Sequence, residues 1–489
     1  MGNAVVDFSG RPFHFIGIGG IGMSAIAHIL AEKNVPVSGS DVKLNHITQR
    51  LSDRGVRVFM QQDASNLSTF ATDQPSSKQS ASFLPQVVCS TAIDPSNVEY
   101  RAALDLGCPV FHRSDVLAAL LQGYTSIAVG GTHGKTTTSS LIAYLLLEAG
   151  MDPTIVVGGE VDAWNGNARL GHGTYLVAEA DESDGSLVKF APHIGIVTNI
   201  ELDHPDHYES LDEVITIFQR FRSQSDVFIG CVDCPTLRNQ FEIDISYGLD
   251  ESTQADYTVT DLRFHADQTC AMVCEHGQPL GTLKLRLLGR HNLSNALAAV
   301  AVGRYVGIPF QKIASILATF DGAHRRFEKR GCYSDITFLD DYAHHPSELK
   351  ATLTAARTQA SVVQSGDRKR IVAVFQPHRY SRTATFLEDF AQSFNEADLI
   401  VISDIYSAGE QKTYGMSGRV VAEAIAQHHP HVIYRPTLTD VEIFLKDALK
   451  SGDLVLFLGA GNLNKVIPDL LDFYRQKQDQ VLQSSVYGS

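Results

Sequence analysis

The stretch GGTHGKTTT, residues 130–138, is the starting point for interpreting this chain. It follows Ser126–Val129, an apolar segment that predicts a buried strand, and it precedes Leu141–Leu147, which predicts a helix. A glycine turn between a strand and a helix, continuing into a lysine and a hydroxyl residue, is typical of phosphate binding. In that pattern the lysine, here Lys135, meets the outer phosphates, and the first hydroxyl, here Thr136, meets Mg²⁺.

The turn departs from the common form of this motif. A glycine is usual five residues before Gly134, and this chain has Val129 there, so the turn is shortened. The alternative interpretation is a tight turn with an exposed lysine. The strand and the helix on either side favour a site for a nucleoside triphosphate.

A second glycine turn lies near the N-terminus. Gly17, Gly19 and Gly22 follow the predicted strand Phe13–Ile16 with the spacing G-x-G-x-x-G, and Asp41 ends the next strand. This spacing lets the backbone approach a diphosphate, and an acid at that strand end can bind ribose hydroxyls. Alone it indicates NAD or FAD, but any nucleoside diphosphate fits such a turn. A turn without any ligand is the other alternative.

Acidic residues follow the predicted strand Tyr175–Ala178. The segment Glu179–Asp184 holds four carboxylates, which are costly at a strand end unless a cation or solvent satisfies them. Beside a triphosphate, Mg²⁺ is the better explanation, and a solvated loop is the alternative. The next strand, His193–Val197, leads to His204 at the same predicted sheet edge, where ligands of open α/β sheets gather.

A third α/β unit follows, with predicted strands at Ile336–Leu339, Ile371–Phe375, Leu399–Ile402 and Leu454–Leu458. The second of these strands ends in QPHRYSRT, residues 376–383. Two arginines three positions apart at a strand end can bind a carboxylate with paired hydrogen bonds. A solvated loop is again the alternative.

Size and composition fit a globular protein of two to four domains. The chain has 489 residues, 44% hydrophobic and 19% charged, with a net charge of −15, which argues against nucleic-acid and membrane binding. The seven cysteines suggest no disulfide framework and are expected to be reduced thiols. The N-terminus shows no signal peptide and no apolar run is long enough to span a membrane, so a cytoplasmic protein is expected. Residues 64–86, rich in Ser, Thr, Gln and Pro, predict a surface loop.

Together, these features describe a diphosphate turn, a triphosphate loop with metal-binding acids, and a carboxylate site. An oxidoreductase that binds NAD at the diphosphate turn does not need the triphosphate loop. A ligase that uses ATP to join a carboxylate on a nucleotide-linked substrate to a small amino acid needs all three.

Seven motifs resemble those of the Mur ligases over about residues 11–465. They are FIGIGGIGMSAIA, GTHGKTTT, EADESD, NIELDH, GRHNLSNALAA, DDYAHHP and QPHRYSRT, in that order. The resemblance implies three α/β domains: residues 1–122 for a UDP-sugar, 123–328 for ATP on a phosphate-loop fold, and 329–489 for the amino acid. The first and third would be Rossmann-like, and each would be built on a mainly parallel sheet. The short phosphate loop is the family's own form.

The resemblance also implies roles for individual residues. Those similar to ATP-binding residues are Gly130, Gly131, Thr132, His133, Gly134, Lys135, Thr136, Thr137, His291, Asn292, Asn295, Arg326 and Asp341. Those similar to UDP-sugar-binding residues are Gly17, Gly19, Gly20, Gly22, Asp41, Ser90, Thr91 and Arg113. Those similar to amino-acid-binding residues are Tyr342, His344, Arg379 and Arg382. The implied Mg²⁺ residues are Thr136, Glu179 and His204, and the implied catalytic residues are Lys135, Glu179, His204 and His344.

The implied reaction joins L-alanine to the carboxylate of UDP-N-acetylmuramate through an acyl phosphate, with ATP and Mg²⁺. A recycling ligase that adds a tripeptide to the same UDP-sugar is the nearest alternative, and QPHRYSRT favours the single amino acid. An NAD-dependent Rossmann oxidoreductase and a non-catalytic nucleotide-binding module are the others. A monomer or a weak homodimer is expected.

Overall fold

The computed structural model describes residues 5–72, 84–361, 369–412 and 415–487. Over these residues the chain is an α/β protein with three mainly parallel sheets. It divides into two compact units, of which the first comprises residues 1–200, 214–246 and 301–308 and the second comprises residues 201–213, 247–300 and 309–489. None of the helices described is long and apolar enough to cross a bilayer.

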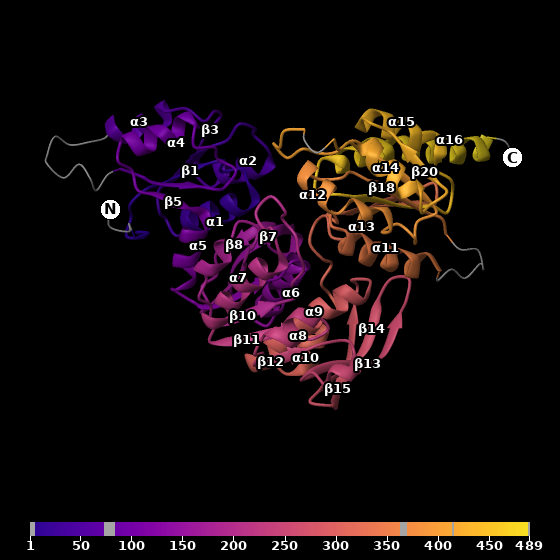
Figure 1. Cartoon of the computed structure of the whole chain (residues 1–489), viewed down its shortest axis with the longest axis horizontal. Helices are drawn as coiled ribbons and strands as arrows, with labels where there is room; N and C mark the ends of the chain where they lie inside the picture. The colour runs from indigo at the N-terminus through magenta and orange to yellow at the C-terminus, as the bar shows by residue number, and fades with distance from the viewer. Residues whose placement is uncertain (1–4, 73–83, 362–368, 413–414, 488–489) are drawn as a thin grey trace. The chain divides into compact units, whose positions relative to one another are not determined.

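The first sheet lies in the first unit and has the strand order β3-β2-β1-β4-β5, with every pairing parallel. Its strands are β1 Phe13–Ile16, β2 Val37–Ser40, β3 Arg57–Phe59, β4 Gln86–Cys89 and β5 Val110–His112. The helices between them are α1 Ile21–Glu32, α2 His46–Asp53, α3 Ser65–Thr72 and α4 Val98–Asp105, and α5 Arg113–Leu121 follows β5 (Figure 1). All four residues of β1 are buried, as expected for the middle of a parallel sheet covered on both faces.

The second sheet has most of its strands in the first unit, in the order β11-β10-β6-β9-β7-β8. They are β6 Thr125–Gly130, β7 Thr154–Val161, β8 Gly166–Arg169, β9 Tyr175–Glu179, β10 Ile194–Val197 and β11 Val227–Cys231. Its helices in this unit are α6 Lys135–Glu148, α7 Leu211–Ser223, whose first residues belong to the second unit, and α8 Pro235–Gln240. The central strand β6 pairs in parallel with β9 and β10, so the carboxyl ends of all three meet at one edge.

In the second unit, β13 Tyr257–Phe264, β14 Thr269–Glu275 and β15 Gln278–Leu285 form an antiparallel meander. The short strand β12 Ile245–Tyr247 pairs with β13 through Tyr247 and Tyr257. The alanine-rich helix α9 Arg290–Tyr305 follows, and then α10 Phe310–Leu317.

The third sheet lies in the second unit, in the order β16-β17-β21-β18-β19-β20, and only β16 is antiparallel to its neighbour. Its strands are β16 Glu328–Tyr333, β17 Ile336–Asp341, β18 Ile371–Phe375, β19 Leu399–Ile402, β20 Val432–Tyr434 and β21 Leu454–Leu458. Its helices are α11 Pro346–Ser361, α12 Tyr380–Thr385, α13 Leu387–Ala391, α14 Gly418–Ala426, α15 Leu438–Ala448 and α16 Ile467–Tyr487. Alternate residues of the central strands enter two apolar clusters, one on each face of the sheet.

The predicted strands of all three units are confirmed, and the seven cysteines are free thiols, as predicted. The antiparallel pair β7–β8 was not predicted, because its glycines and polar residues obscure the alternation of a strand. The loop predicted over residues 64–86 is wrong where α3 forms. Asp63 accepts a hydrogen bond from the Ser65 N–H at that helix's start, and Leu67 is buried. Residues 73–83 of that stretch lie outside the described residues.

Candidate active site

The phosphate loop, residues 130–136, joins the end of β6 to the start of α6. Gly131 has φ 129° and Gly134 has φ 82°, which side chains rarely adopt. A Cβ atom at Gly131 would also collide with the hydroxyl of Thr198. Gly134 is the N-cap of α6, so no side chain satisfies the first N–H groups of that helix in the usual way, and an anion can do so.

Two residues that follow β10, Thr198 and Asn199, hold the loop in this shape. The Asn199 side chain accepts from the His133 N–H at 2.9 Å and donates to the His133 carbonyl at 3.1 Å. The Asn199 carbonyl accepts from the Thr132 N–H at 2.9 Å, and the Thr198 hydroxyl donates to the His133 carbonyl at 2.6 Å. Two amides of the turn therefore bind Asn199, and an anion can bind at Gly134 and the start of α6, which has no side-chain cap.

Lys135 is partly buried in an acidic environment. Its Nζ donates to the carbonyls of Gly131 at 2.6 Å and Thr132 at 3.1 Å, and it lies 2.9 Å from the carboxylate of Glu182. Burial alone would lower the pKa of Lys135, but the charges of Glu182 and the neighbouring acids outweigh it and raise the pKa. The side chain is therefore an ammonium group, as phosphate binding requires.

The acidic segment after β9 supplies oxygen ligands at the same edge. Glu179 accepts a hydrogen bond from the Gly158 N–H of β7 at 2.8 Å, and a Cβ atom at position 158 would lie 2.5 Å from that carboxylate. Thr136 is the second residue of α6, and both Glu179 and Thr136 lie in the first unit. Carboxylate and hydroxyl oxygens are the hard ligands that Mg²⁺ prefers, so this donor set fits the ion.

The N-terminal glycine turn is held by residues 40 and 41 at the end of β2. The Ser40 carbonyl accepts from the N–H groups of Gly17 at 2.8 Å and Ile18 at 2.9 Å. The Asp41 carboxylate accepts from the Gly19 N–H at 2.8 Å, and it leaves little space for a side chain at position 19. These amides are therefore already used, and the start of α1, which has no side-chain cap, is the part that a diphosphate can approach.

Arg113 connects the glycine turn to the acidic segment. One of its Nη atoms lies 3.2 Å from the position that a Cβ of Gly22 would take. The other Nη atom pairs with Asp181 at 2.7 Å and lies 3.6 Å from Asp184. The first unit thus brings a predicted UDP-sugar residue beside the acids that follow β9. Ser90 and Thr91 follow β4, at the carboxyl edge of the first sheet.

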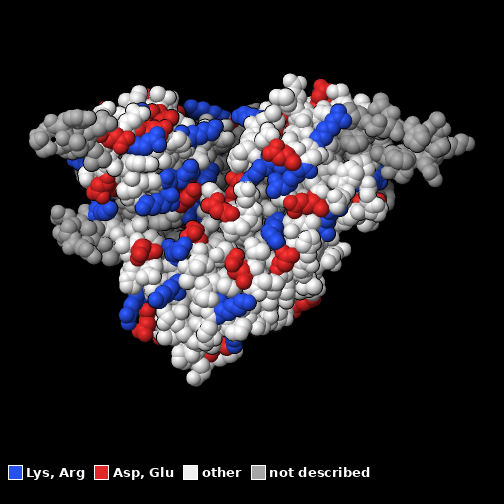
Figure 2. All heavy atoms as spheres, turned by 180° about the vertical axis from the view of Figure 1, so that it is seen from behind, with Lys and Arg blue, Asp and Glu red and all other residues white. Residues whose placement is uncertain are grey.

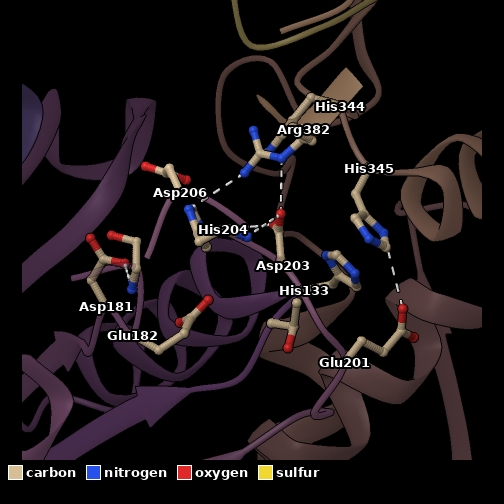
Figure 3. A network of polar contacts seen from close by, with 12 residues as sticks. His133, Asp181, Glu182, Glu201, Asp203, His204, Asp206, His344, His345 and Arg382 are labelled. Atoms are coloured by element: carbon tan, nitrogen blue, oxygen red, sulfur yellow. Dashed lines mark hydrogen bonds and ion pairs between the residues drawn. The ribbon is translucent and has the colours of Figure 1, made fainter. Parts of the chain in front are cut away.

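In the second unit, Arg382 is the centre of a buried polar cluster (Figure 3). Its Nε pairs with the buried carboxylate of Asp203 at 2.8 Å, and its Nη2 lies 3.5 Å from the Nδ1 of His204. The positive charge of Arg382 holds the pKa of Asp203 well below its usual range, despite the opposing effect of burial.

Arg379 is also paired with acids. It contacts Asp206 at 2.5 Å and Glu410 at 3.6 Å, and its backbone has φ 66°, an unusual conformation for a residue other than glycine. Both arginines predicted to bind the amino acid carboxylate are therefore paired with acidic side chains of this unit.

The tautomers of two histidines follow from their partners. The Nδ1 of His344 lies 2.9 Å from the Tyr342 carbonyl, which can only accept, so Nδ1 carries the proton and Nε2 has the lone pair. The Nδ1 of His378 lies 3.2 Å from the Arg382 guanidinium, which can only donate, so the His378 proton is on Nε2. Burial lowers the pKa of His344 to about 4 and that of His378 to about 2, so both rings are neutral near pH 7.

Asp341, the last residue of β17, binds the backbone just before β16 and just after β17. Its carboxylate accepts from the N–H groups of Phe327 and Ala343, both at 2.7 Å, and burial raises its pKa to about 6. The guanidinium of Arg326 lies 5.1 Å from the ring centre of Tyr342. In this structure Asp341 therefore shapes the backbone around Arg326 and Tyr342.

The three predicted ATP residues of α9 also lie in the second unit. The Asn292 amide donates to the Leu288 carbonyl at 2.8 Å, and the Asn295 amide lies 3.5 Å from the Asn292 oxygen. Burial lowers the pKa of His291 to about 4, so its ring is neutral.

Sequence reasoning missed the residues that hold the site in shape. Asn199 and Asp203 fall inside the motif NIELDH and Thr198 directly precedes it, but their polar side chains alone do not show which groups they contact. Gly158 and Glu410 lie in segments without any recognised motif. A polar residue directly after a buried strand was the one signal for Thr198 and Asn199.

Three family models match consecutive parts of the chain. They are the Mur ligase family catalytic domain at residues 12–125, the Mur ligase middle domain at 129–303, and the Mur ligase glutamate ligase domain at 325–461. A protein of Nostoc punctiforme named UDP-N-acetylmuramate–L-alanine ligase is 62% identical over 471 residues, 95% of this chain and 97% of that protein. The chain belongs to the Mur ligase family. A protein of the same name from Nostoc sp. is 60% identical over 96% of this chain and 98% of that protein.

Solved structures of Mur ligases share this fold. The UDP-N-acetylmuramate–alanine ligase of Thermotoga maritima matches with a TM-score of 0.80 and 26% identity, over 95% of this chain and 99% of that one. A murein peptide ligase of Psychrobacter arcticus matches with a TM-score of 0.68 and 22% identity over the same shares, which shows a common fold alone. Mur ligases use ATP, in agreement with the chemistry of the phosphate loop.

The role of Asn199 in shaping the phosphate loop can be tested by Asn199→Ala. The variant loses both side-chain hydrogen bonds to His133, and we expect ATP or ADP to bind about tenfold more weakly, because the loop must then be ordered by the nucleotide. Titration calorimetry with ADP measures this. Asn239→Ala, on the exposed end of α8, is the control and should bind normally. Equal affinity in Asn199→Ala would contradict the role.

His344 should make stability depend on pH. The pKa of His344 is lowered to about 4 in the folded chain, so the unfolded chain binds a proton first as the pH falls. The contribution of His344 to the free energy of unfolding is therefore fully present above pH 6.5 and is lost as the pH falls from 6.5 towards 4. Between those values we expect wild type to lose about 3 kcal/mol more stability than His344→Gln. Urea denaturation at several pH values measures the difference. His428→Gln, at an exposed position, is the control and should behave like wild type. If the free energy of unfolding of His344→Gln changes with pH in parallel with that of wild type, the lowered pKa of His344 is refuted.

Proposed function

We propose that this chain joins L-alanine to the carboxylate of UDP-N-acetylmuramate, in the first peptide-adding step of peptidoglycan precursor synthesis, and uses ATP and Mg²⁺. The observation that carries the proposal is the partly buried Lys135 ammonium on a phosphate loop beside oxygen ligands. The chain is also 62% identical to a protein named UDP-N-acetylmuramate–L-alanine ligase. UDP-N-acetylmuramate and L-alanine are the proposed partners. Cytoplasmic action as a monomer or weak homodimer is also proposed.

The first unit would activate the carboxylate. The carboxylate oxygen would attack the γ-phosphorus of ATP, with loss of ADP, to give an acyl phosphate. The amine of L-alanine would then attack the acyl carbon, form the amide bond and release phosphate and a proton. Lys135 and the first turn of α6 would offset the charge of the transferring phosphoryl group, with Thr136 and Glu179 as ligands of Mg²⁺, and His204 of the second unit as a further metal residue. We also propose that the three domains span residues 1–122, 123–328 and 329–489.

The start of α1, with Gly20, Gly22 and Arg113, would bind the UDP diphosphate. His291, Asn292, Asn295, Arg326 and Asp341 of the second unit would contribute to the nucleotide site. Closure of the site would exclude water, which otherwise hydrolyses the acyl phosphate.

The second unit would hold the amine. Arg379 and Arg382 would bind the carboxylate of L-alanine, which requires each to exchange an acidic partner for the substrate. The Nε2 lone pair of His344 can accept a hydrogen bond from the attacking amine, and its low pKa keeps it available throughout the neutral range. Because a base of such low pKa holds a proton weakly, we assign His344 to orienting the amine beside Tyr342.

Phosphate release tests the proposal directly. With ATP, Mg²⁺ and UDP-N-acetylmuramate present, L-alanine should stimulate release, and the peptide-linked product should appear by mass spectrometry. If the tripeptide supports turnover and L-alanine does not, the recycling reaction is the correct one. Tight NADH binding without UDP-sugar binding would instead support an oxidoreductase.

On the face drawn in Figure 2, acidic and basic side chains are interspersed, which gives no support to a nucleic-acid partner.

Lys135→Ala should strongly reduce turnover while the chain stays folded. We expect kcat to fall about 10²–10³-fold or more, because the charge opposite the transferring phosphoryl group is lost. Lys189→Ala, which removes an ammonium paired with Asp115 in the same unit, is the matched control. Circular dichroism checks the fold. Normal turnover in Lys135→Ala would favour the non-catalytic nucleotide-binding module.

A further inference from the structure

A fully buried carboxylate lies beneath the N-terminal glycine turn. Glu99, on α4, has no exposed surface, and neither has His14 on β1. The Nε2 of His14 lies 2.8 Å from one Glu99 oxygen, and the Asn66 amide donates to that oxygen at 2.7 Å. A carboxylate in such a place is costly unless its oxygens are fully hydrogen bonded, so a simple packing role would be met better by an apolar side chain.

The remaining Glu99 oxygen accepts a short hydrogen bond from the Ser40 hydroxyl. Ser40 is the last residue of β2 and is also fully buried. Its carbonyl is the group that accepts from the N–H groups of Gly17 and Ile18. Glu99 and the glycine turn therefore hold the same residue, one through its side chain and the other through its main chain.

We propose that Glu99 is a positioning residue for the nucleotide-sugar site and acts through Ser40. By fixing Ser40 at the end of β2, Glu99 sets the direction of the Ser40 carbonyl and so the shape of the turn at residues 17–19. The shape of the turn in turn places the start of α1, where the UDP diphosphate would bind. The identity of the ligand rests on the proposed function, whereas the effect on the turn does not.

A matched pair of substitutions on β2 separates this role from a purely structural one. Ser38 and Ser40 are both buried, and both hydroxyls belong to the network, because the Ser38 hydroxyl lies 2.8 Å from the Nδ1 of His14. Only Ser40 accepts from the glycine turn. Ser40→Ala and Ser38→Ala each remove one buried hydroxyl and should lower the melting temperature by similar amounts.

The two variants should differ in ligand binding. We expect Ser40→Ala to weaken UDP binding about tenfold in titration calorimetry and to raise the KM for the UDP-sugar, with kcat and the KM for ATP nearly unchanged. Ser38→Ala should stay close to wild type. Glu99→Gln should act like Ser40→Ala, because its amide group cannot accept from all three donors. Equal effects of Ser38→Ala and Ser40→Ala, or no effect of Ser40→Ala, would overturn the proposal.

Hydrogen exchange provides a readout that needs no ligand. The amides of residues 17–19 should exchange faster in Ser40→Ala and Glu99→Gln than in wild type and Ser38→Ala. Unchanged exchange would refute the positioning role. If wild type fails to bind UDP while exchange responds as expected, the proposed substrate is wrong and the positioning role stands.

Discussion

A charge that leaves water must be paired, and this constraint shapes each functional region of the protein. Lys135 pairs with the buried Glu182, Arg382 pairs with Asp203, and the buried Glu99 carboxylate lies 2.8 Å from the Nε2 of His14. Lys135 and Glu99 lie in the first turns of α6 and α4, and Arg382 lies in α12. The pairs keep charged side chains in fixed directions, which a binding site needs and an apolar core cannot provide.

The two glycine turns of the first unit are held by the same device. In each, residues at the end of a neighbouring strand bind the amides of the turn, Ser40 and Asp41 in one and Asn199 in the other. The turn amides are thereby used inside the protein, and the beginning of the following helix remains for the anion. Glycine is required in both because the holding residues occupy the space that a side chain would take.

The two arginines predicted to bind the substrate carboxylate differ from these helix starts, because both are already paired. Arg379 and Arg382 already have acidic partners, so a substrate carboxylate competes with Asp206 and Asp203 for them. Such competition lowers affinity for a carboxylate alone and favours a ligand that makes further contacts at the same time. Neutral His344 and His378, with protons on opposite ring nitrogens, add one acceptor and one donor to the same cluster.

The sequence by itself determined the three mainly parallel sheets, the phosphate loop and the residues at the strand ends, because periodic burial and glycine spacing are local properties of the chain. The hairpin β7–β8 was not determined in this way, because its glycines and polar residues obscure the alternation of a strand. Helix α3 was not either, because Leu67 packs against distant residues such as Ile16 and Val87. Only the tertiary structure decided that Asn199 shapes the phosphate loop, that Arg113 faces Asp181, and that Glu99 lies behind Ser40. These residues are distant in sequence from the groups they hold, and their side chains could equally cap a helix or face solvent until the fold brings them together.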